Sequence, residues 1–330
     1  MDKICVIGAG HWGSALCALL GGKGFINVTL WAFEKDIVEG INRDGINPVF
    51  MPGVRFSKNV RATSDLQTAV EGAGCVLFVV PSQFARAVVR EASQWIGEDA
   101  IVVSAVKGIE KGTLKTASGV IREFTGARVA VLSGPSFAAE VVMKQPTAVT
   151  LAVQDKAAGA ILQEVFNTDY FRVYTHDDII GAEIGGALKN VIAVASGITD
   201  GLGLGTNTRA ALITRGLAEI TRLGVALGAN ERTFSGLSGL GDLVLTCTGT
   251  LSRNYSVGFR LGRGELLKDI LGDSREVAEG VETSASAFEL ARKTGVEMPI
   301  VEQVYRVIHE GKHPGEAVSE LMTRRVRDEF

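Results

Sequence analysis

Residues 3–13 read KICVIGAGHWG, and this stretch decides the fold of the N-terminal part of the chain. The apolar run Ile4–Ile7 is typical of a buried β-strand, and the glycines after it have the spacing G-x-G-x-x-G. Helical spacing of apolar residues follows from Gly13 to Leu20. A strand, a glycine-rich turn and a helix in this order predict the first β-α unit of a dinucleotide-binding sheet.

Each glycine of this loop has an expected role. Gly8 permits a tight turn, Gly10 lets the backbone approach a pyrophosphate, and Gly13 lets the helix pack closely against the sheet. The amides and the dipole at the start of the helix then favour the negative charge of the phosphates. FAD-binding proteins use the same loop, so the motif indicates a dinucleotide and leaves its kind open.

A second apolar run, Val28–Trp31, ends just before Phe33 and Glu34. In dinucleotide-binding sheets an acidic residue near this point accepts the hydroxyls of the adenosine ribose. It would also repel a 2′-phosphate. The alternative is that Glu34 is an ordinary exposed residue of a turn. With the motif before it, we expect Phe33 and Glu34 to contact the cofactor, and Glu34 to favour NAD over NADP.

Short apolar runs alternate with helical patterns up to about residue 180. Strands are expected at Lys3–Ile7, Val28–Trp31, Val76–Val80, Ile101–Val106, Val129–Leu132, Ala148–Val153 and Phe171–Tyr174. Helices are expected between them, among others at Phe84–Trp95, Leu114–Phe124 and Lys156–Phe166. Because strands that are apolar throughout are covered on both faces, the pattern predicts an α/β fold with a doubly wound, mainly parallel sheet of the Rossmann type.

Beyond residue 180 the strand pattern ends, and long segments with helical spacing follow. They are Ile180–Ile198, Thr208–Leu227, Ser284–Thr294 and Val301–Glu310. We therefore expect two domains, a dinucleotide-binding domain at 1–180 and an all-α substrate-binding domain at 181–330. A helix near Asp178–Ala195 is expected to join them beside a cleft.

The composition argues against several classes of protein. With 34 basic and 37 acidic residues the net charge is −3, and the basic residues are scattered, so nucleic acid is not an expected partner. The N-terminus lacks the apolar core and the cleavage site of a signal peptide. The apolar stretch Val191–Ile198 is too short for a membrane span. We expect a soluble protein of the cytoplasm.

The cysteines and histidines show no metal-ligand spacing. The cysteines are Cys5, Cys17, Cys75 and Cys247. They have apolar neighbours and are expected in the core, which suits a reducing compartment. His309 and His313 lie four residues apart, but Gly311 and Pro314 argue against a shared helical face. No metal is expected.

A charged residue interrupts the apolar segment Gly185–Val191, which reads GGALKNV. Lys189 lies among small or apolar neighbours on an expected helix, where burying a lysine is costly without a partner. One interpretation is that Lys189 protonates a carbonyl oxygen, or stabilises negative charge on it, while Asn190 orients the substrate. The alternative is a surface lysine that extends its amine into solvent.

A glycine-rich stretch, Ser235–Asp242 (SGLSGLGD), precedes several polar residues. Thr246 follows it, and Ser252, Arg253 and Asn254 come next. Glycines permit close backbone approach. An arginine beside a hydroxyl and an amide suits a small phosphate ester, because the guanidinium offers planar, charge-assisted donors. The alternative is a glycine-rich loop that caps a helix starting near Ser252.

Two polar segments follow strands of the expected parallel sheet. Lys107 comes directly after Ile101–Val106, and Ser133–Ser136 (SGPS) follows the next strand. Open α/β sheets bind ligands at the carboxyl ends of their strands. Both segments are therefore expected to face the ligand.

Several motifs together resemble one family. They are residues 8–13 (GAGHWG), 104–110 (SAVKGIE), 132–136 (LSGPS), 185–190 (GGALKN) and 251–254 (LSRN). In this order they closely resemble bacterial NAD(P)-dependent glycerol-3-phosphate dehydrogenase, and the likeness extends over nearly the whole chain, including 199–203 (TDGLG) and 278–280 (AEG). The resemblance implies NAD or NADP as cofactor. It also implies reversible reduction of dihydroxyacetone phosphate to sn-glycerol 3-phosphate, which feeds phospholipid synthesis.

The resemblance further implies roles for particular residues. Lys189 is the expected acid/base catalyst, with Lys107 and Asp242 completing its polar network. Substrate contacts are expected at Lys107, Gly134, Ser136, Lys189, Asn190, Asp242, Thr246, Ser252, Arg253 and Asn254. Cofactor contacts are expected in the loop, after the second strand and at five further positions. The residues are Gly8, Gly10, His11, Trp12, Gly13, Phe33, Glu34, Lys107, Ala138, Arg253, Val277 and Glu279. A homodimer is the expected assembly, because dimers are the commonest one.

Two positions depart from the pattern of the family. Many members have a basic residue just after the second strand that grips a 2′-phosphate, whereas this chain has Glu34 followed by Lys35. We therefore expect use of NAD, or of both nucleotides. His11 replaces a small serine of the loop. We expect its side chain to point to solvent.

Two other functions fit parts of the pattern. β-Hydroxyacid and 6-phosphogluconate dehydrogenases also join a nucleotide-binding sheet to a helical domain. Their asparagine usually follows the lysine by several residues, whereas Lys189 and Asn190 are adjacent. A non-catalytic dinucleotide sensor would need the loop but not a lysine, an aspartate and an arginine clamp. Both alternatives are therefore disfavoured.

Overall fold

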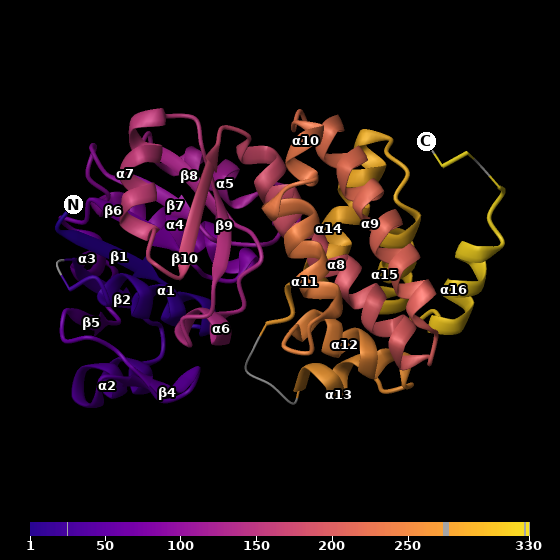
Figure 1. Ribbon diagram of the computed structural model, residues 1–330, viewed down its shortest axis with the longest axis horizontal. Helices are drawn as coiled ribbons and strands as arrows, with labels where there is room; N and C mark the ends of the chain where they lie inside the picture. Colours follow the sequence, from indigo (N-terminus) through magenta and orange to yellow (C-terminus); the bar gives the residue numbers. More distant parts are fainter. Residues whose placement is uncertain (25, 273–276, 327, 330) are drawn as a thin grey trace. The chain divides into compact units, whose positions relative to one another are not determined.

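The computed structural model describes residues 1–24, 26–272, 277–326 and 328–329. Contacts within the chain divide it into two compact units. The first unit consists of Met1–Lys107 and Lys115–Glu183, and the second of Gly108–Leu114 and Ile184–Phe330. In Figure 1 the labelled strands belong to the first unit, and the second is built from helices.

The first unit is organised around one sheet. The strands of this unit are β1 (Lys3–Ile7), β2 (Asn27–Trp31), β3 (Ile46–Asn47), β4 (Met51–Arg55), β5 (Val60–Thr63), β6 (Cys75–Phe78), β7 (Ile101–Ser104), β8 (Arg128–Ser133), β9 (Thr147–Val153) and β10 (Phe171–His176). β3 and β4 form a separate small hairpin. The other eight form the sheet, in the order β10-β9-β8-β7-β6-β1-β2-β5. All neighbours are parallel except β8 and β9. The expected mainly parallel sheet is confirmed. Because β2 and β6 flank β1, the strand order reverses at β1, and such a reversal is where these sheets bind ligands.

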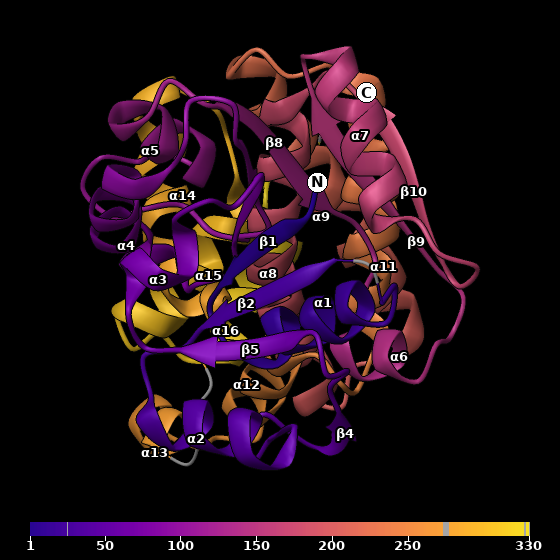
Figure 2. The same ribbon diagram turned by 90° about the vertical axis from the view of Figure 1, so that its left-hand side faces the viewer.

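Helices cover both faces of this sheet. They are α1 (His11–Gly21), α2 (Lys35–Asp44), α3 (Leu66–Val70), α4 (Ala85–Ala92), α5 (Ala117–Phe124), α6 (Ala138–Val142) and α7 (Lys156–Phe166). Alternate residues of β1 face opposite ways: Ile4 and Val6 pack in one core with α1, α2 and α7, and Cys5 and Ile7 in another with α3, α4 and α5. Figure 2 shows α3, α4 and α5 on one side of β1 and β2, and α1 and α7 on the other. The doubly wound arrangement is therefore confirmed.

The second unit is helical. Its helices are α8 (Ile179–Gly201, whose first five residues belong to the first unit), α9 (Thr206–Ala226), α10 (Glu231–Phe234), α11 (Asp242–Thr248), α12 (Arg253–Gly262), α13 (Leu267–Gly272), α14 (Glu279–Thr294), α15 (Pro299–His309) and α16 (Pro314–Met322). A π-helical turn at Leu237–Gly241 precedes α11. In the described part of the chain α8 alone is long and apolar enough to cross a membrane. Since 94% of its apolar window is buried inside the protein, it matches the expected core helix.

Glycines let α8 and α12 touch through their backbones. Gly197 and Gly201 lie four residues apart on α8, and Gly258 and Gly262 have the same spacing on α12. A Cβ at Gly197 would lie 2.0 Å from the carbonyl oxygen of Tyr255, and one at Gly201 would lie 2.3 Å from that of Phe259. Side chains at these positions would therefore force the two helices apart. The contact fixes the start of α12 relative to α8.

Some elements differ from the sequence-based expectation. The helix expected at Leu114–Phe124 begins at Ala117, because Leu114 has φ +59° and cannot continue a helix. The helix expected at Phe84–Trp95 has 3₁₀ turns at both ends of α4. The hairpin and β5 were not expected, because their short strands contain polar residues and lack an apolar run.

The units do not follow the single boundary expected between 180 and 181. The last passage of the chain lies between Glu183 and Ile184, and the segment Gly108–Leu114 groups with the second unit. Ile109 explains this grouping, because it is fully buried in the helical core. Lys111 also forms an ion pair with Glu282 of α14.

Candidate active site

The glycine-rich loop lies at the carboxyl end of β1 and leads into α1. Gly8 has φ +117°, and a Cβ at Gly13 would lie 1.9 Å from the carbonyl oxygen of Gly8. Other residues would therefore distort the turn or push α1 from the sheet. A Cβ at Gly10 would meet nothing within 4 Å. The open side of the loop at the start of α1 fits a pyrophosphate group.

Asn47 fixes this loop, and the sequence analysis did not identify it. Its buried side chain donates from Nδ2 to the carbonyl oxygen of Ala9 at 2.8 Å and to Ser14 Oγ at 2.9 Å. Its Oδ1 accepts from the backbone amides of Val49 at 3.1 Å and Phe50 at 3.0 Å. The Ala9 carbonyl is thus held by an internal donor, which favours one conformation of the loop.

Four further expected cofactor residues lie in or next to the loop or at the end of β2. Trp12, in α1, has a buried indole Nε1 without a hydrogen-bond partner among the residues that the structure describes. Buried indole donors usually have a partner, so Trp12 fits a contact with a bound group. His11 is exposed, as expected, with its ring centre 5.4 Å from that of Phe50. Phe33 is 80% exposed, and the exposed Glu34 is the N-cap of α2.

The residues that follow β7 and β8 meet at the same edge of the sheet as the loop, since β1, β7 and β8 run parallel. Lys107 Nζ donates to the carbonyl oxygen of Gly134 at 3.2 Å, and Ser136 Oγ donates to the same oxygen at 3.0 Å. Gly134 has φ +127°. Ala138 starts α6 immediately afterwards. The first unit therefore gathers Lys107, Gly134 and Ser136 into one polar cluster.

Lys189 lies on α8 within the second unit, and its side chain is only 9% exposed. Its Nζ forms an ion pair with Asp242 and donates to Thr246 Oγ1 at 2.9 Å. Asp242 is fully buried at the first position of α11, and Thr246 lies one turn later. The Thr246 hydroxyl donates its own hydrogen to the Asp242 carbonyl oxygen at 2.6 Å, so it accepts from Lys189. The lysine is thus a buried, partnered cation rather than a surface side chain.

The glycine-rich stretch explains how Asp242 reaches Lys189. A Cβ at Gly185 on α8 would lie 2.4 Å from the carbonyl oxygen of Ser238, and one at Gly239 would lie 2.2 Å from that of Phe234. The π-helical turn can therefore press against α8 and against the end of α10. The helix that follows begins with Asp242 pointing to the lysine.

A chain of amide hydrogen bonds continues from the lysine cluster. Asn254 Nδ2 donates to Asn190 Oδ1 at 2.9 Å, and the backbone amide of Gly280 donates to Asn254 Oδ1 at 2.8 Å. Both asparagines are buried. The sequence analysis cited the motif of Gly280 without this role, and a Cβ there would lie 2.5 Å from the Asn190 carbonyl oxygen. The chain links α8, α12 and α14.

The remaining expected residues of the second unit lie at the starts of α12 and α14. Ser252 is the N-cap of α12, and its Oγ accepts from the amide of Tyr255 at 3.2 Å. Ser252 therefore caps α12, and Arg253 follows it as the first residue of that helix. Glu279 is the first residue of α14. Val277 is 45% exposed.

Burial makes the neighbouring thiol a poor nucleophile. Cys247 lies in α11, and burial raises its pKa to about 12, with a smaller opposing effect of the Lys189 charge. The other cysteines are buried as well, as expected. Within the described residues no group of three or more His, Cys, Asp or Glu could hold a metal ion.

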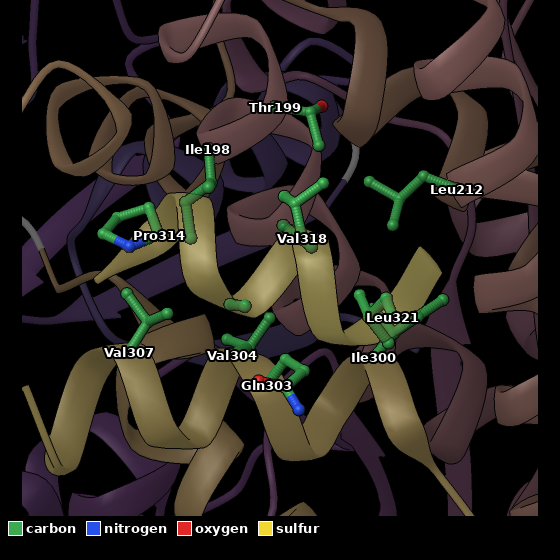
Figure 3. A pocket seen from close by; sticks show the side chains of 12 residues that line it. Ile198, Thr199, Leu212, Ile300, Gln303, Val304, Val307, Pro314, Val318 and Leu321 are labelled. Carbon is green, nitrogen blue, oxygen red and sulfur yellow. The ribbon is translucent and has the colours of Figure 1, made fainter. Parts of the chain in front are cut away.

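Two hollows in the second unit are lined by other residues. A cavity of about 30 Å³ lies between α8, α9, α15 and α16, and Figure 3 shows that the side chains around it, such as Val304, Val307 and Val318, are largely apolar. A wider groove of about 1440 Å³ is lined mainly by α9, the start of α15, and α16 with the residues after it. Neither is lined by Lys189 or Asp242.

A loop of the dinucleotide-binding type and a buried lysine–aspartate pair fit the class of two-domain dehydrogenases. Comparison with known proteins specifies the family. Residues 3–159 match the model of the NAD-dependent glycerol-3-phosphate dehydrogenase N-terminus, and residues 178–319 match that of its C-terminus. The chain therefore belongs to the NAD-dependent glycerol-3-phosphate dehydrogenase family and is an oxidoreductase.

Individual relatives agree with this assignment. The glycerol-3-phosphate dehydrogenase (NAD(P)+) of Citrifermentans bemidjiense is 54% identical over 332 residues, covering 99% of both chains. That of Geobacter sulfurreducens is 53% identical with the same coverage. The crystal structure of glycerol-3-phosphate dehydrogenase from Coxiella burnetii superposes with a TM-score of 0.95 at 40% identity, covering 98% of this chain and 99% of that one.

Proposed function

We propose that the protein reversibly reduces dihydroxyacetone phosphate to sn-glycerol 3-phosphate, with Lys189 as the general acid. The observation that best supports this proposal is the buried cluster of Lys189, Asp242 and Thr246. A lysine is costly to bury, and the ion pair offsets that cost while keeping a protonated amine in place. A positioned proton donor is what the reduction of a ketone requires.

The reaction balances with one hydride and one proton. Reduced NAD or NADP supplies the hydride to the carbonyl carbon. In the proposed step Lys189 Nζ stabilises the growing negative charge on the carbonyl oxygen and transfers a proton to it as the π bond breaks. In the reverse direction the neutral amine accepts the hydroxyl proton. Asp242 stabilises the ammonium form and orients it, and Thr246 fixes its direction.

The phosphate of the substrate requires donors of its own. We assign them to Ser252, Arg253 and Asn254 at the start of α12, where a guanidinium can bind phosphate with two parallel hydrogen bonds. Asn190 supports Asn254 through their hydrogen bond. Lys107, Gly134 and Ser136 form the polar cluster of the first unit and are assigned as further substrate contacts.

The geometry of the loop supports part of the proposed cofactor site. We assign the pyrophosphate site to Gly8, Gly10 and Gly13, and Trp12 offers a buried indole donor. Exposed Phe33 and Glu34 suit the adenosine end, and the carboxylate favours NAD, or use of both nucleotides. We assign the remaining cofactor contacts to His11, Lys107, Ala138, Arg253, Val277 and Glu279.

In the cell, we propose that the enzyme works in the cytoplasm as a homodimer and supplies sn-glycerol 3-phosphate to phospholipid synthesis. The same fold alone would not indicate this substrate. The ketopantoate reductase of Ralstonia eutropha, for example, shares it with a TM-score of 0.62 at 18% identity. The adjacent Lys189 and Asn190 and the family matches at residues 3–159 and 178–319 favour the phosphorylated ketone.

An assay of the purified protein tests the proposal. It should oxidise reduced nicotinamide when dihydroxyacetone phosphate is added and form an equal amount of sn-glycerol 3-phosphate. Dihydroxyacetone without its phosphate and a β-ketoacid serve as control substrates and should be far poorer. Turnover indistinguishable from background with both NADH and NADPH would exclude the proposed function.

A further inference from the structure

The chain passes between its two units at three places. It leaves the first unit after Lys107, returns to it at Lys115, and leaves again after Glu183. We infer that the buried carboxylate of Glu183 fastens the last two passages to the first unit and thereby positions Lys189, six residues further along α8. The inference rests on the proposed role of Lys189 as the proton donor.

Three donors converge on the Glu183 carboxylate. Thr116 Oγ1 donates to Oε2 at 2.6 Å, Ser118 Oγ donates to Oε2 at 2.5 Å, and the Ser118 amide donates to Oε1 at 2.8 Å. The Glu183 residue is 4% exposed. Burial raises its pKa, and the hydrogen bonds from Ser118 and Thr116 oppose that effect. A buried carboxylate with three donors holds its partners tightly.

Glu183 serves as the missing cap of α5. Thr116 is the N-cap residue of α5, yet its side chain accepts no hydrogen bond from the helix. The amide of Ser118, at the second helical position, donates to Glu183 instead. An acceptor at this point satisfies a backbone donor, and a negative charge there is favourable. The cap comes from α8, 65 residues later in the chain.

The returning passage has a defined conformation just before this cap. Leu114 is the last residue of the segment that belongs to the second unit, and it has φ +59°. A non-glycine residue in that region is strained unless its surroundings hold it. Its amide donates to the carbonyl oxygen of Glu110 at 3.1 Å, and its side chain packs against the helical core. Glu183 binds Thr116, two residues beyond Leu114, so the turn is held on both sides.

The helix connects this anchor to the catalytic lysine. α8 is continuous from Ile179 to Gly201, and every residue from 181 to 199 is buried. Six residues of helix span about 9 Å, without a break that could absorb movement. If the anchor is lost, the Lys189 cluster keeps its own contacts, but the start of α8 is no longer tied to α5. Loose placement of a catalytic group lowers the rate of the chemical step rather than binding.

Substitutions at the anchor test this inference. Glu183→Gln keeps the shape but cannot accept from all three donors, and we expect kcat to fall about tenfold or more. The dissociation constant of NADH should change less than about twofold, because the loop at Gly8–Gly13 is untouched. Ser118→Ala removes one donor and should lower kcat by a smaller factor. Ser118→Thr keeps the hydroxyl, and its kcat should equal that of the wild type.

Glu219→Gln is the matched control. Glu219 is 2% exposed and accepts from the amides of Ile300 and Val301 at the start of α15, so it is also a buried glutamate that caps a distant helix. It lies wholly within the second unit. Glu219→Gln should change the melting temperature but not kcat. Equal losses of kcat in both variants, or a Glu183→Gln variant that loses only stability, would overturn the inference.

Hydrogen exchange separates this inference from the proposed function. In Glu183→Gln the amide of Ser118 and those of residues 184–188 should exchange faster than in the wild type. This readout does not depend on turnover. If the wild type fails to reduce dihydroxyacetone phosphate, the proposed function fails, while faster exchange still supports the anchor. Unchanged exchange at these amides contradicts the anchor, whatever the activity.

Discussion

Lys189 has its charge at a position where water has little access. Its side chain is 9% exposed, and that of its partner Asp242 is fully buried. Moving two ions out of water costs several kcal/mol each, and apolar residues of similar size would often be as stable. The pair is therefore poorly explained by stability. The proposed role of Lys189 as a positioned proton donor would explain it.

The clamp formed by Asn47 gives a first prediction at this scale. Asn47→Ala removes two donors that hold Ala9 and Ser14, so the loop should become less ordered before it binds a nucleotide. We expect the dissociation constant of NADH to rise about tenfold, which corresponds to roughly 1.4 kcal/mol. Titration of the protein with NADH measures it.

Asn59→Ala is the control for this variant. Asn59 also ties two parts of the first unit together, through a 2.6 Å hydrogen bond from Nδ2 to the carbonyl oxygen of Ile26. It should lower stability without weakening the binding of NADH. Similar weakening in both variants would show that Asn47 acts only through general stability.

Glu34 gives a second prediction, on the choice of cofactor. Its exposed carboxylate at the end of β2 should repel a 2′-phosphate, so kcat/KM for NADH should equal or exceed that for NADPH. Glu34→Gln should raise kcat/KM for NADPH about fivefold while changing that for NADH less, because a charge repulsion of about 1 kcal/mol is removed. Glu39→Gln, an exposed residue of the same helix, should have no such effect. A strong NADPH preference in the wild type would refute this role of Glu34.

Single residues were predictable where their chemistry was unusual for their neighbours. Lys189 stood out as a lysine in an apolar helix, and the structure pairs it with Asp242 and Thr246, which were also expected. Asn47 and Glu183 could not be found in this way. Their partners lie tens of residues away, and an asparagine or a glutamate has no local pattern that reveals a distant cap.

At the scale of elements, two buried glutamates replace local helix caps. Glu183 caps α5, and Glu219 on α9 caps α15. In both cases a long helix provides the acceptor for the start of another, which ties elements together more firmly than apolar contact alone. The structural cost is a buried carboxyl group, and burial raises the pKa of Glu219 to about 7.

The raised pKa of Glu219 predicts how the free energy of unfolding depends on pH. Between about 4.5 and 7 the folded protein keeps the Glu219 proton that the unfolded chain releases, so the free energy of unfolding falls as pH rises through this window. From the size of this pKa shift, the free energy of unfolding falls by about 3 kcal/mol across the window. Glu219→Gln should lack this contribution. Urea unfolding of both proteins at pH 4.5 and pH 8 measures the difference, and parallel pH profiles would contradict the account.

Elements were predictable where the apolar pattern extended over the whole helix or strand. The limits of β1 and α7 agree with expectation because a continuous apolar run and a clear helical period define them. The hairpin of β3 and β4 was missed, since its strands are short and partly exposed. The start of α5 was misplaced because the backbone of Leu114 depends on contacts with the distant helical core.

At the scale of the whole molecule, the proposed cofactor loop and the proposed proton donor lie in separate units. The first contains the dinucleotide loop and the Lys107 cluster, and the second contains the lysine, its partners and the start of α12. The pattern of strands followed by helices predicted a strand-rich part and a helical part of the chain. It could not predict that Gly108–Leu114 joins the second unit, because that depends on the burial of Ile109.

The proposed homodimer is tested at this scale. A single chain has a mass of 34.9 kDa, and light scattering after size-exclusion chromatography should give about twice that value at the concentration of the assay. Dilution should separate the copies only well below that concentration. A particle with the mass of one chain that is fully active would contradict a functional dimer.

The most direct test of the central claim is the steady-state kinetics of Lys189→Ala beside Arg253→Ala and the wild type, with dihydroxyacetone phosphate as substrate. Lys189→Ala should lower kcat by about a hundredfold or more, since it removes the proton donor. Arg253→Ala should chiefly raise KM, and Lys268→Ala, at an exposed lysine of α13, should change neither. A Lys189→Ala enzyme that keeps its kcat and only raises KM would contradict the account.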